Sequence, residues 1–144
     1  MVLVLPEDSL SANFKKLNFS WAYDYLNDAN YWSKRSHDLE TKCGAYIVDK
    51  DMVPISFGYN GHVRDTICEL PRTRPEKYDY MIHAEMNAIF NSTRSGRSTK
   101  DSVIFVTGKP CHICLQAIWQ CGIKTVVYSN LSKPKICESE KAKD

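Results

Sequence analysis

The sequence predicts an α/β domain in which helices pack against a central mixed sheet, and two observations indicate this. Residues 43–48 and 52–60 are rich in β-forming residues and flank the turn Asp49-Lys50-Asp51, a pattern that predicts an antiparallel hairpin. Residues 102–106 and 124–128 are short apolar runs with a helix pattern between them. Strands joined by a helix are usually parallel, so a sheet that contains both pairs is mixed.

The length and composition of the chain exclude several classes of protein. The chain has 144 residues, of which 43% are hydrophobic and 25% charged, as in globular proteins. We expect one domain over residues 1–144, with a flexible polar tail at 129–144. A net charge of +2 is too small to indicate a nucleic acid or an anionic membrane as partner. No run approaches the ~20 apolar residues that span a bilayer and no basic leader is present, so we expect a cytoplasmic protein.

The first element expected is an amphipathic helix over residues 19–33. Apolar and aromatic residues recur there every three or four positions, at Trp21, Tyr25, Ala29 and Trp32. This spacing predicts a stripe that faces the core. In the hairpin that follows, Pro54 indicates an edge strand or a bulge. Residues 61–81 then show two prolines, many charges and little periodicity, and an irregular stretch of ~20 residues within a compact domain is usually functional.

Two further helices follow the hairpin. One begins at His83-Ala84-Glu85 and ends at Gly96, which fits a C-cap glycine. The other begins after Pro110 and ends at Gly122. We expect the buried strands at 102–106 and 124–128 to lie on either side of this second helix.

Cysteine usage is the unusual feature of the composition. The six cysteines are Cys43, Cys68, Cys111, Cys114, Cys121 and Cys137. They fit either disulfides or a metal site, and the reducing cytosol favours a metal site together with core packing. The i, i+3 spacing of Cys111 and Cys114 directs both sulfurs from the first turn of a helix, where the thiolate form is favoured.

A histidine and a glutamate complete a candidate metal site. With His83 as third ligand, the two cysteines leave zinc a fourth position for water, which is typical of catalytic sites. Glu85 would lie beside that water and transfer its proton. The pattern His-x-Glu…Pro-Cys-x-x-Cys is the signature of zinc nucleobase deaminases. The alternatives are a zinc knuckle with a chance glutamate, or an ordinary core histidine and cysteine pair.

Four segments resemble the deoxycytidylate (dCMP) deaminases of the cytidine deaminase superfamily, in particular short phage-type members. The segments are RSHDLETKCGAYIV (35–48), SFGYNG (56–61), HAEMNAIF (83–90) and PCHICLQAIWQCGIKTVVY (110–128). Gly-Tyr-Asn-Gly together with Asn87-Ala88-Ile89 is typical of dCMP deaminases within the superfamily. The resemblance implies a three-layer α/β/α cytidine deaminase-like fold with a central mixed sheet, and a catalytic core at about residues 19–128.

The resemblance also implies an activity and its cofactor. The expected reaction is zinc-dependent hydrolytic deamination of dCMP to dUMP and ammonia, which supplies dUMP for thymidylate synthesis. His83, Cys111 and Cys114 are the expected ligands of one Zn²⁺, and water attacks carbon 4 of the cytosine. Glu85 is the catalytic residue and carries protons to the adjacent ring nitrogen and then to the leaving amine.

Four residues are candidates for contact with the substrate. By resemblance, Asn60 binds the sugar or the base edge, and Tyr59 shapes the pocket. Arg35 is the first candidate for the phosphate and Arg64 the second, although either arginine could be a solvated surface residue. Lys109 departs from the family, which more often has a small polar or apolar residue there, so it either touches the phosphate or faces solvent.

Regulation and assembly are further implications of the resemblance. Family members are often homohexamers, activated by dCTP and inhibited by dTTP with Mg²⁺. We therefore expect a homohexamer with these effectors, and contributions from residues 61–81 and the Gly-Tyr-Asn-Gly segment. Two departures weaken this expectation: sixteen residues follow Tyr128 where the family has a further helix and strand, and residues 62–80 depart from the usual pattern.

Two other functions stay open. One is deamination of another cytidine or adenosine substrate, including adenosine in RNA, although the low net charge gives RNA binding little support. The other is a catalytically silent zinc module that binds nucleotides, which would have no use for Glu85.

The remaining histidines and cysteines are expected to have minor roles. We expect His112 to point away from the ligands, and His37 and His62 to be polar loop residues. Cys68 could join His62 in a second, structural zinc site, but further ligands are not obvious. Cys43 and Cys121 are expected in the core.

Overall fold

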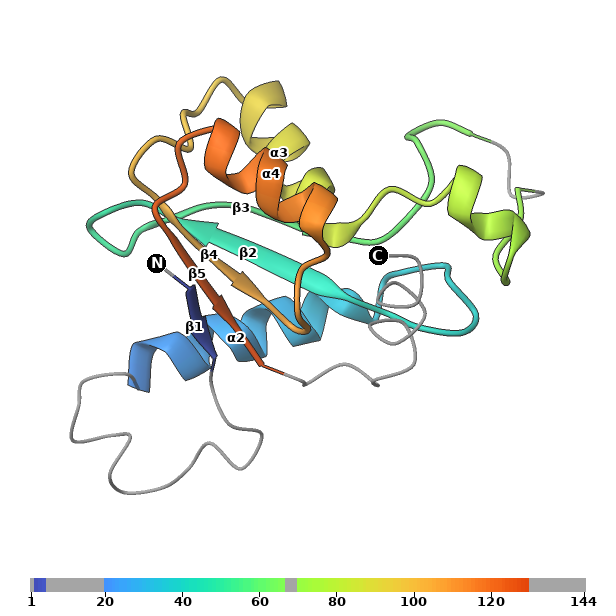
Figure 1. Ribbon diagram of the computed structural model, residues 1–144, viewed down its shortest axis with the longest axis horizontal. Helices are drawn as coiled ribbons and strands as arrows, with labels where there is room; N and C mark the ends of the chain where they lie inside the picture. The colour runs from blue at the N-terminus through green and yellow to red at the C-terminus, as the bar shows by residue number, and fades with distance from the viewer. Residues whose placement is uncertain (1, 5–19, 67–69, 130–144) are drawn as a thin grey trace.

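The computed structural model describes residues 2–4, 20–66 and 70–129. A five-stranded sheet forms its centre, with the strands in the order β1 (Val2–Val4), β5 (Thr125–Tyr128), β4 (Val103–Val106), β2 (Gly44–Val48) and β3 (Pro54–Tyr59). Helix α2 (Ser20–Ser33) covers one face. Helices α3 (Ala84–Arg94) and α4 (His112–Gln120) cover the other (Figure 1). The predicted three-layer α/β/α fold is therefore confirmed.

The pairing of the strands makes the sheet mixed, as predicted. β2 pairs antiparallel with β3 and with β4, whereas β4 and β5 are parallel. β3 ends the sheet, and the register shifts between Ile47 and Val48, so that Val48 pairs with Pro54. The proline thus begins an edge strand beside a bulge, where its missing N–H breaks no ladder. β1, which pairs parallel with β5, was not predicted, since three residues are too few to show a period.

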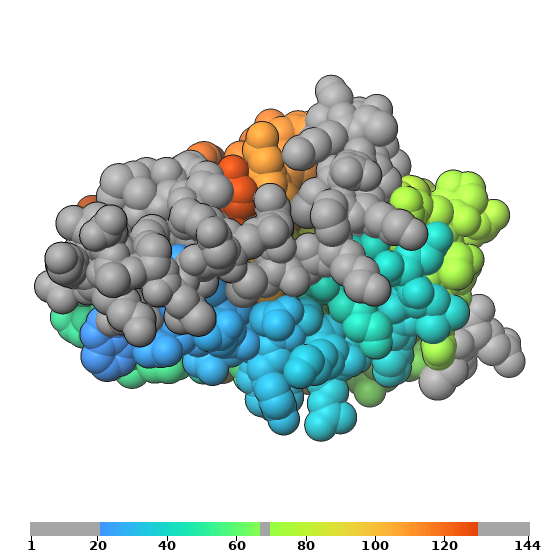
Figure 2. All heavy atoms as spheres, turned by 90° about the horizontal axis from the view of Figure 1, so that it is seen from below, coloured from blue at the N-terminus to red at the C-terminus, as the bar shows by residue number. Residues whose placement is uncertain are grey.

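Helix α2 contacts the sheet through a stripe that contains Tyr25 and Ala29, as predicted. Ala22 and Leu26 are also buried there. Trp21 is 60% exposed and stacks on Tyr25 instead of entering the core, so the expectation for Trp21 was wrong. Figure 2 views this side of the molecule and shows the side chains of α2, in blue, along the lower part of the face.

The opposite face of the sheet carries the larger core. Apolar residues from β2, β4 and β5 pack there against Ala84, Ala88 and Ile89 of α3 and Ile118 of α4. Both helices begin at the same end of the sheet, with His83 as the N-cap of α3 and Cys111 as the N-cap of α4. The close packing of both helices on the sheet therefore fixes the positions of these two residues.

The described residues of this segment, 61–66 and 70–81, have more order than the sequence suggests. Gly61 and Ile82 exchange two backbone hydrogen bonds of 3.0 and 2.7 Å, so the stretch is closed at its base. It contains a short 3₁₀ helix, η1 (Glu76–Asp79), at the far end of the molecule from the hairpin turn (Figure 1). None of the helices described is both long and apolar enough to cross a membrane.

Candidate functional site

The two helix N-termini bring the three predicted metal ligands together. Nδ1 of His83 lies 3.3 Å from Sγ of Cys114 and 3.6 Å from Sγ of Cys111. All three donor atoms lie within 4.8 Å of one another, and both cysteines are buried. Cys111 Sγ also accepts a hydrogen bond from the backbone N–H of Cys114 and so caps α4.

The spacing of these atoms fits a tetrahedral zinc ion. Zinc bonds of about 2.3 Å to sulfur and about 2.0–2.1 Å to nitrogen place neighbouring ligand atoms about 3.6 Å apart in a tetrahedron. The nitrogen–sulfur distances here agree with that separation. Thiolate and imidazole are ligands that suit zinc, whereas magnesium and calcium prefer oxygen.

The protonation of Cys111 also favours metal binding. A hydrogen bond with the Cys114 thiol is the largest cause that lowers the pKa of Cys111, to about 3, and burial opposes this effect. Hydrogen bonds from the His83 ring and the Cys114 N–H lower the pKa further. Cys111 is therefore a thiolate at neutral pH, which is the form that binds a metal.

Glu85 lies in the first turn of α3 and is 6% exposed. Burial is the main cause that raises the pKa of its carboxyl group above the usual value. The charge of His83 and hydrogen bonds from the backbone and Cys114 only partly oppose this rise. A carboxyl group with a raised pKa exchanges protons more readily near neutral pH, as a general acid and base must.

A cavity opens beside Glu85 and His83 and has room for water, with an internal volume of about 30 Å³. Its walls come from the residues before β2, the end of β3, the 61–81 segment, the start of α3, and the end of β4 with the β4–α4 connection. The residues that line it are Asp38, Cys43, Asn60, Lys77, Tyr78, Met81, His83, Ala84, Glu85, Val106, Gly108 and Lys109. Of the four predicted substrate-binding residues, Asn60 lines this cavity.

Asn60 is held by protein groups on all sides. Its Nδ2 donates to Oδ2 of Asp38 at 3.2 Å and to the carbonyl of Thr41 at 3.1 Å. Its Oδ1 accepts from the N–H of Cys43 at 2.9 Å, and the side chain is buried. Both amide protons are used, so any bond from this side chain to a ligand must use the second lone pair of Oδ1. Contact with substrate through Asn60 stays a prediction.

The structure places the other three predicted substrate-binding residues elsewhere. Arg35, Tyr59 and Arg64 line a second groove of about 700 Å³ between β3, α3 and the start of the 61–81 segment. Arg94 lines the same groove, and Arg64 donates to Oδ1 of Asn91. None of the three lines the cavity that contains Glu85. Their contact with dCMP stays a prediction. The structure shows only that these three residues line a different cavity from the one that Glu85 lines.

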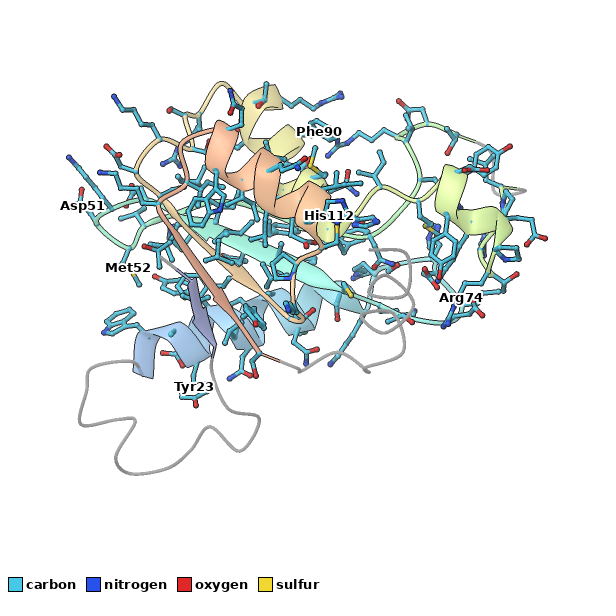
Figure 3. All side chains as sticks on the ribbon, viewed as in Figure 1. Tyr23, Asp51, Met52, Arg74, Phe90 and His112 are labelled. Carbon is cyan, nitrogen blue, oxygen red and sulfur yellow. The ribbon has the colours of Figure 1, made fainter. Side chains whose placement is uncertain are left out.

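The other histidines and cysteines lie as expected where they are described. His112 is exposed at the start of α4, outside the cluster of candidate ligands (Figure 3). His37 is exposed, and His62 hydrogen-bonds to the carbonyl of Pro71 at 2.9 Å. Cys43 and Cys121 are half-buried, form no disulfide with another described cysteine, and pack against the core. Cys68 and Cys137 lie outside the described residues, and so does the proposed second zinc site.

Sequence reasoning missed a buried ion pair in the cavity wall. Nζ of Lys77 lies 2.8 Å from Oδ2 and 3.0 Å from Oδ1 of Asp38. Lysine is almost never fully buried unless it is paired, and the charged segment around Lys77 shows no pattern that indicates burial. The pair could not be found without knowing that residues 36–42 and 73–81 lie side by side.

Comparison with known proteins agrees with this geometry. The family model described as "Cytidine and deoxycytidylate deaminase zinc-binding region" matches residues 19–130. The chain belongs to this family. A probable deoxycytidylate deaminase of Caenorhabditis elegans is 38% identical over 109 residues, which are 72% of this chain and 54% of the relative. The human deoxycytidylate deaminase is 33% identical over 119 residues, or 73% of this chain and 66% of the human protein.

Solved structures of the family share the fold. The dCMP deaminase of the cyanophage S-TIM5, in a crystal structure with dCMP and dUMP, is 28% identical and has a TM-score of 0.63. The match covers 83% of this chain and 82% of the phage chain. The apo form of the phage enzyme gives 31% identity and a TM-score of 0.65 over 74% of this chain and 80% of the phage chain. By contrast, the chain spans about half the length of the worm relative.

Proposed function

We propose that the protein is a zinc-dependent dCMP deaminase that hydrolyses dCMP to dUMP and ammonia. The observation that carries the proposal is the placement of a buried carboxyl group, Glu85, beside a cluster of one histidine and two cysteines that fits zinc. The relatives named deoxycytidylate deaminase support dCMP as substrate, and so does the phage structure that contains dCMP and dUMP. Residues 19–128 are the proposed catalytic unit.

The candidate ligands His83, Cys111 and Cys114 would hold the zinc ion. Zinc bound there lowers the pKa of a water molecule toward ~7 and so supplies a nucleophile at neutral pH. Glu85 would accept one proton from the water as its oxygen bonds to carbon 4, and donate that proton to the adjacent ring nitrogen. The same carboxyl group would then take the remaining proton from the hydroxyl group on carbon 4 and deliver it to the amine. The carbon–nitrogen bond breaks, the carbonyl of dUMP forms and ammonia leaves. A raised pKa helps Glu85 to act in both directions.

Regulation and assembly belong to the same proposal. We propose that dCTP activates the enzyme and that dTTP with Mg²⁺ inhibits it, and the second groove, with Arg35, Arg64 and Arg94, supports binding of a polyphosphate. A homo-oligomer, by resemblance a hexamer, is supported by large apolar side chains exposed on α3 and α4. These are Phe90 (Figure 3), at 46%, Ile113, at 62%, and Trp119, at 43%.

A cytoplasmic location is also proposed. Four cysteines among the described residues are free thiols, which is usual for proteins of the reducing cytosol. There the product dUMP would supply thymidylate synthesis.

A substrate panel tests the proposal. The zinc-loaded protein is assayed for ammonia release with cytosine, deoxycytidine, dCMP, dCTP and adenosine, with and without dCTP and dTTP–Mg²⁺ as effectors. We expect dCMP to have the highest kcat/KM. A higher kcat/KM for adenosine or free cytosine would contradict dCMP as the substrate. If the zinc-loaded protein turned over none of the compounds, the result would favour a catalytically silent zinc module. A rate on dCMP that does not respond to either effector would contradict the proposed regulation.

A further inference from the structure

The cavity beside Glu85 needs a cation if its ligand is a nucleoside monophosphate. A phosphate monoester carries about −1.5 to −2 charges at pH 7, and burying or crowding such a charge without a partner is costly. Two lysines are the basic residues that line the cavity, apart from the candidate ligand His83. These are Lys77 and Lys109, and one of them must be able to bind the phosphate.

The charge of Lys77 is already balanced by the carboxylates of Asp38 and Glu40. Both carboxylate oxygens of Asp38 lie within 3.0 Å of its ammonium group, and Glu40 Oε1 lies 3.5 Å away. The side chains of Lys77 and Asp38 are each 1% exposed. A phosphate that approached Lys77 would have to displace a buried carboxylate, which would then lose its own partner.

Lys109 differs from Lys77 in each of these respects. Among the described residues that line the cavity, Lys109 is the one classed as exposed. Its side chain forms no hydrogen bond or ion pair with any part of the chain that the structure describes. Its backbone is nevertheless fixed, since Gly108 and Pro110 on either side are buried. An anchored backbone with an exposed ammonium group that no described residue pairs with is suited to binding an anion.

The location of Lys109 also fits the shape of a nucleotide. One residue, Pro110, separates it from the candidate ligand Cys111, and two residue steps span at most about 7 Å. The reacting carbon of the base must lie beside the metal ligands and Glu85, and His83, Glu85 and Lys109 all line this cavity. The sugar separates the base from the phosphate, so the phosphate remains at the rim, and Lys109 is the cation found there.

We propose that Lys109 binds the 5′-phosphate of the substrate and so makes the enzyme prefer a nucleoside monophosphate to the free nucleoside. This inference rests on the proposed deaminase function and assigns the phosphate contact to a residue of the catalytic cavity. It replaces Arg35 and Arg64, which line the second groove. A charged hydrogen bond of this kind changes kcat/KM about tenfold to a hundredfold.

The test compares dCMP with deoxycytidine in matched variants. Lys109→Gln is expected to lower the ratio of kcat/KM for dCMP to that for deoxycytidine about tenfold to a hundredfold, and Lys109→Arg to restore most of it. The control is Lys50→Gln, in the hairpin turn beside Asp51 and Met52, at the end of the sheet opposite His112 (Figure 3). It is expected to leave the ratio unchanged. Zinc content is measured in each variant, and the ratio cancels any loss common to both substrates.

Two results would overturn the inference. One is an equal loss for both substrates in Lys109→Gln, which would mean a general effect on the site. The other is an unchanged ratio in Lys109→Gln together with a lowered ratio in Arg35→Gln, which would return the phosphate to the second groove. If the wild-type protein deaminates neither compound, the proposed function fails. The phosphate site is then tested by comparing the thermal stabilisation that dUMP and deoxyuridine give.

Stabilisation of the wild type by dUMP that is weakened in Lys109→Gln would support the phosphate site. If dUMP did not stabilise the wild-type protein, the proposed phosphate site would be overturned.

Discussion

Nζ of Lys77 lies 2.8 Å from Oδ2 of Asp38, and both side chains are 1% exposed. This ion pair joins the 61–81 segment to the turn that precedes β2. Asp38 also accepts hydrogen bonds from the N–H groups of Glu40 and Thr41 and from the side chain of Asn60. A single carboxylate therefore organises one wall of the candidate catalytic cavity.

Removal of the lysine charge should destabilise the fold. Lys77→Met leaves the Asp38 carboxylate buried without its cation, and the free energy of unfolding is expected to fall by about 3–5 kcal/mol, as measured by urea denaturation. The double variant Lys77→Met/Asp38→Asn should lose less than the sum of its two single variants, because it leaves no unpaired charge. Additive losses would show that the pair does not act as a unit.

A neighbouring carboxylate gives a pH-dependent prediction. Desolvation of the Glu40 carboxylate acts to raise its pKa. The hydrogen bond from the backbone N–H of Arg74 and the charges of Arg74 and Lys77 outweigh this effect, so the pKa of Glu40 lies below the usual 4.5. A lowered pKa contributes stability above pH 4.5, and this contribution is lost as the pH falls through the pKa of the folded state. Glu40→Gln should therefore be less stable than the wild type at pH 7, and the difference in urea midpoint should shrink below pH 4.5. A difference that is constant from pH 7 to pH 3 would contradict this.

The three predicted metal ligands lie together, whereas three of the four residues predicted to contact substrate line a different cavity from Glu85. Cys111 and Cys114 are neighbours on one helical turn, and His83 and Glu85 lie at another helix start. Local spacing therefore sets each half of the cluster, and the packing of α3 and α4 on the sheet brings the halves together. Arg35 was predicted because the matched family segment carries an arginine there, and Arg64 because it follows Gly-Tyr-Asn-Gly. Both line the second groove, and which cavity a side chain lines depends on tertiary packing. For the same reason Lys77 and Asp38, 39 residues apart, gave no signal.

The carboxyl group of Glu85 should be necessary for turnover and dispensable for metal binding. Glu85→Gln keeps the size and burial of the side chain but cannot accept a proton, so kcat for dCMP is expected to fall at least ~10²–10⁴-fold. Zinc content, measured by mass spectrometry, should stay at the wild-type level. Glu76→Gln, an exposed residue of η1, serves as control and should keep full activity. Substantial turnover by Glu85→Gln would assign proton transfer to another group.

The metal should depend on Cys111 and not on the other described thiols outside the cluster. Cys111→Ala removes the thiolate whose pKa is lowered to about 3 and is expected to lose most of the bound zinc. Cys121→Ala removes a half-buried thiol that bonds to the carbonyl of Ile118, and it should keep its zinc. Zinc content after dialysis against a weak chelator measures both variants. A fully metallated Cys111→Ala protein would exclude the assigned ligand set.

Close contact between β3 and α3 positions the catalytic residues and can be tested at Gly58. A Cβ atom on Gly58 would clash with the backbone N of Ala88 and lie 2.7 Å from the carbonyl oxygen of Ala84, so α3 would have to move away. Asn87 and Asn91 reinforce this contact, since their side chains donate to the carbonyls of Tyr59 and Phe57 at 2.8 and 2.7 Å.

Gly58→Ala is therefore expected to lower the free energy of unfolding by about 1–3 kcal/mol. It should also weaken zinc binding, because α3 carries His83 at its N-cap and Glu85 in its first turn. Gly61→Ala is the matched control, since a Cβ there meets nothing within 4 Å and its φ angle is not positive. Urea denaturation and a zinc titration distinguish the two variants. If Gly58→Ala bound zinc as tightly as Gly61→Ala, the position of the ligand cluster would not depend on the packing of α3 against β3.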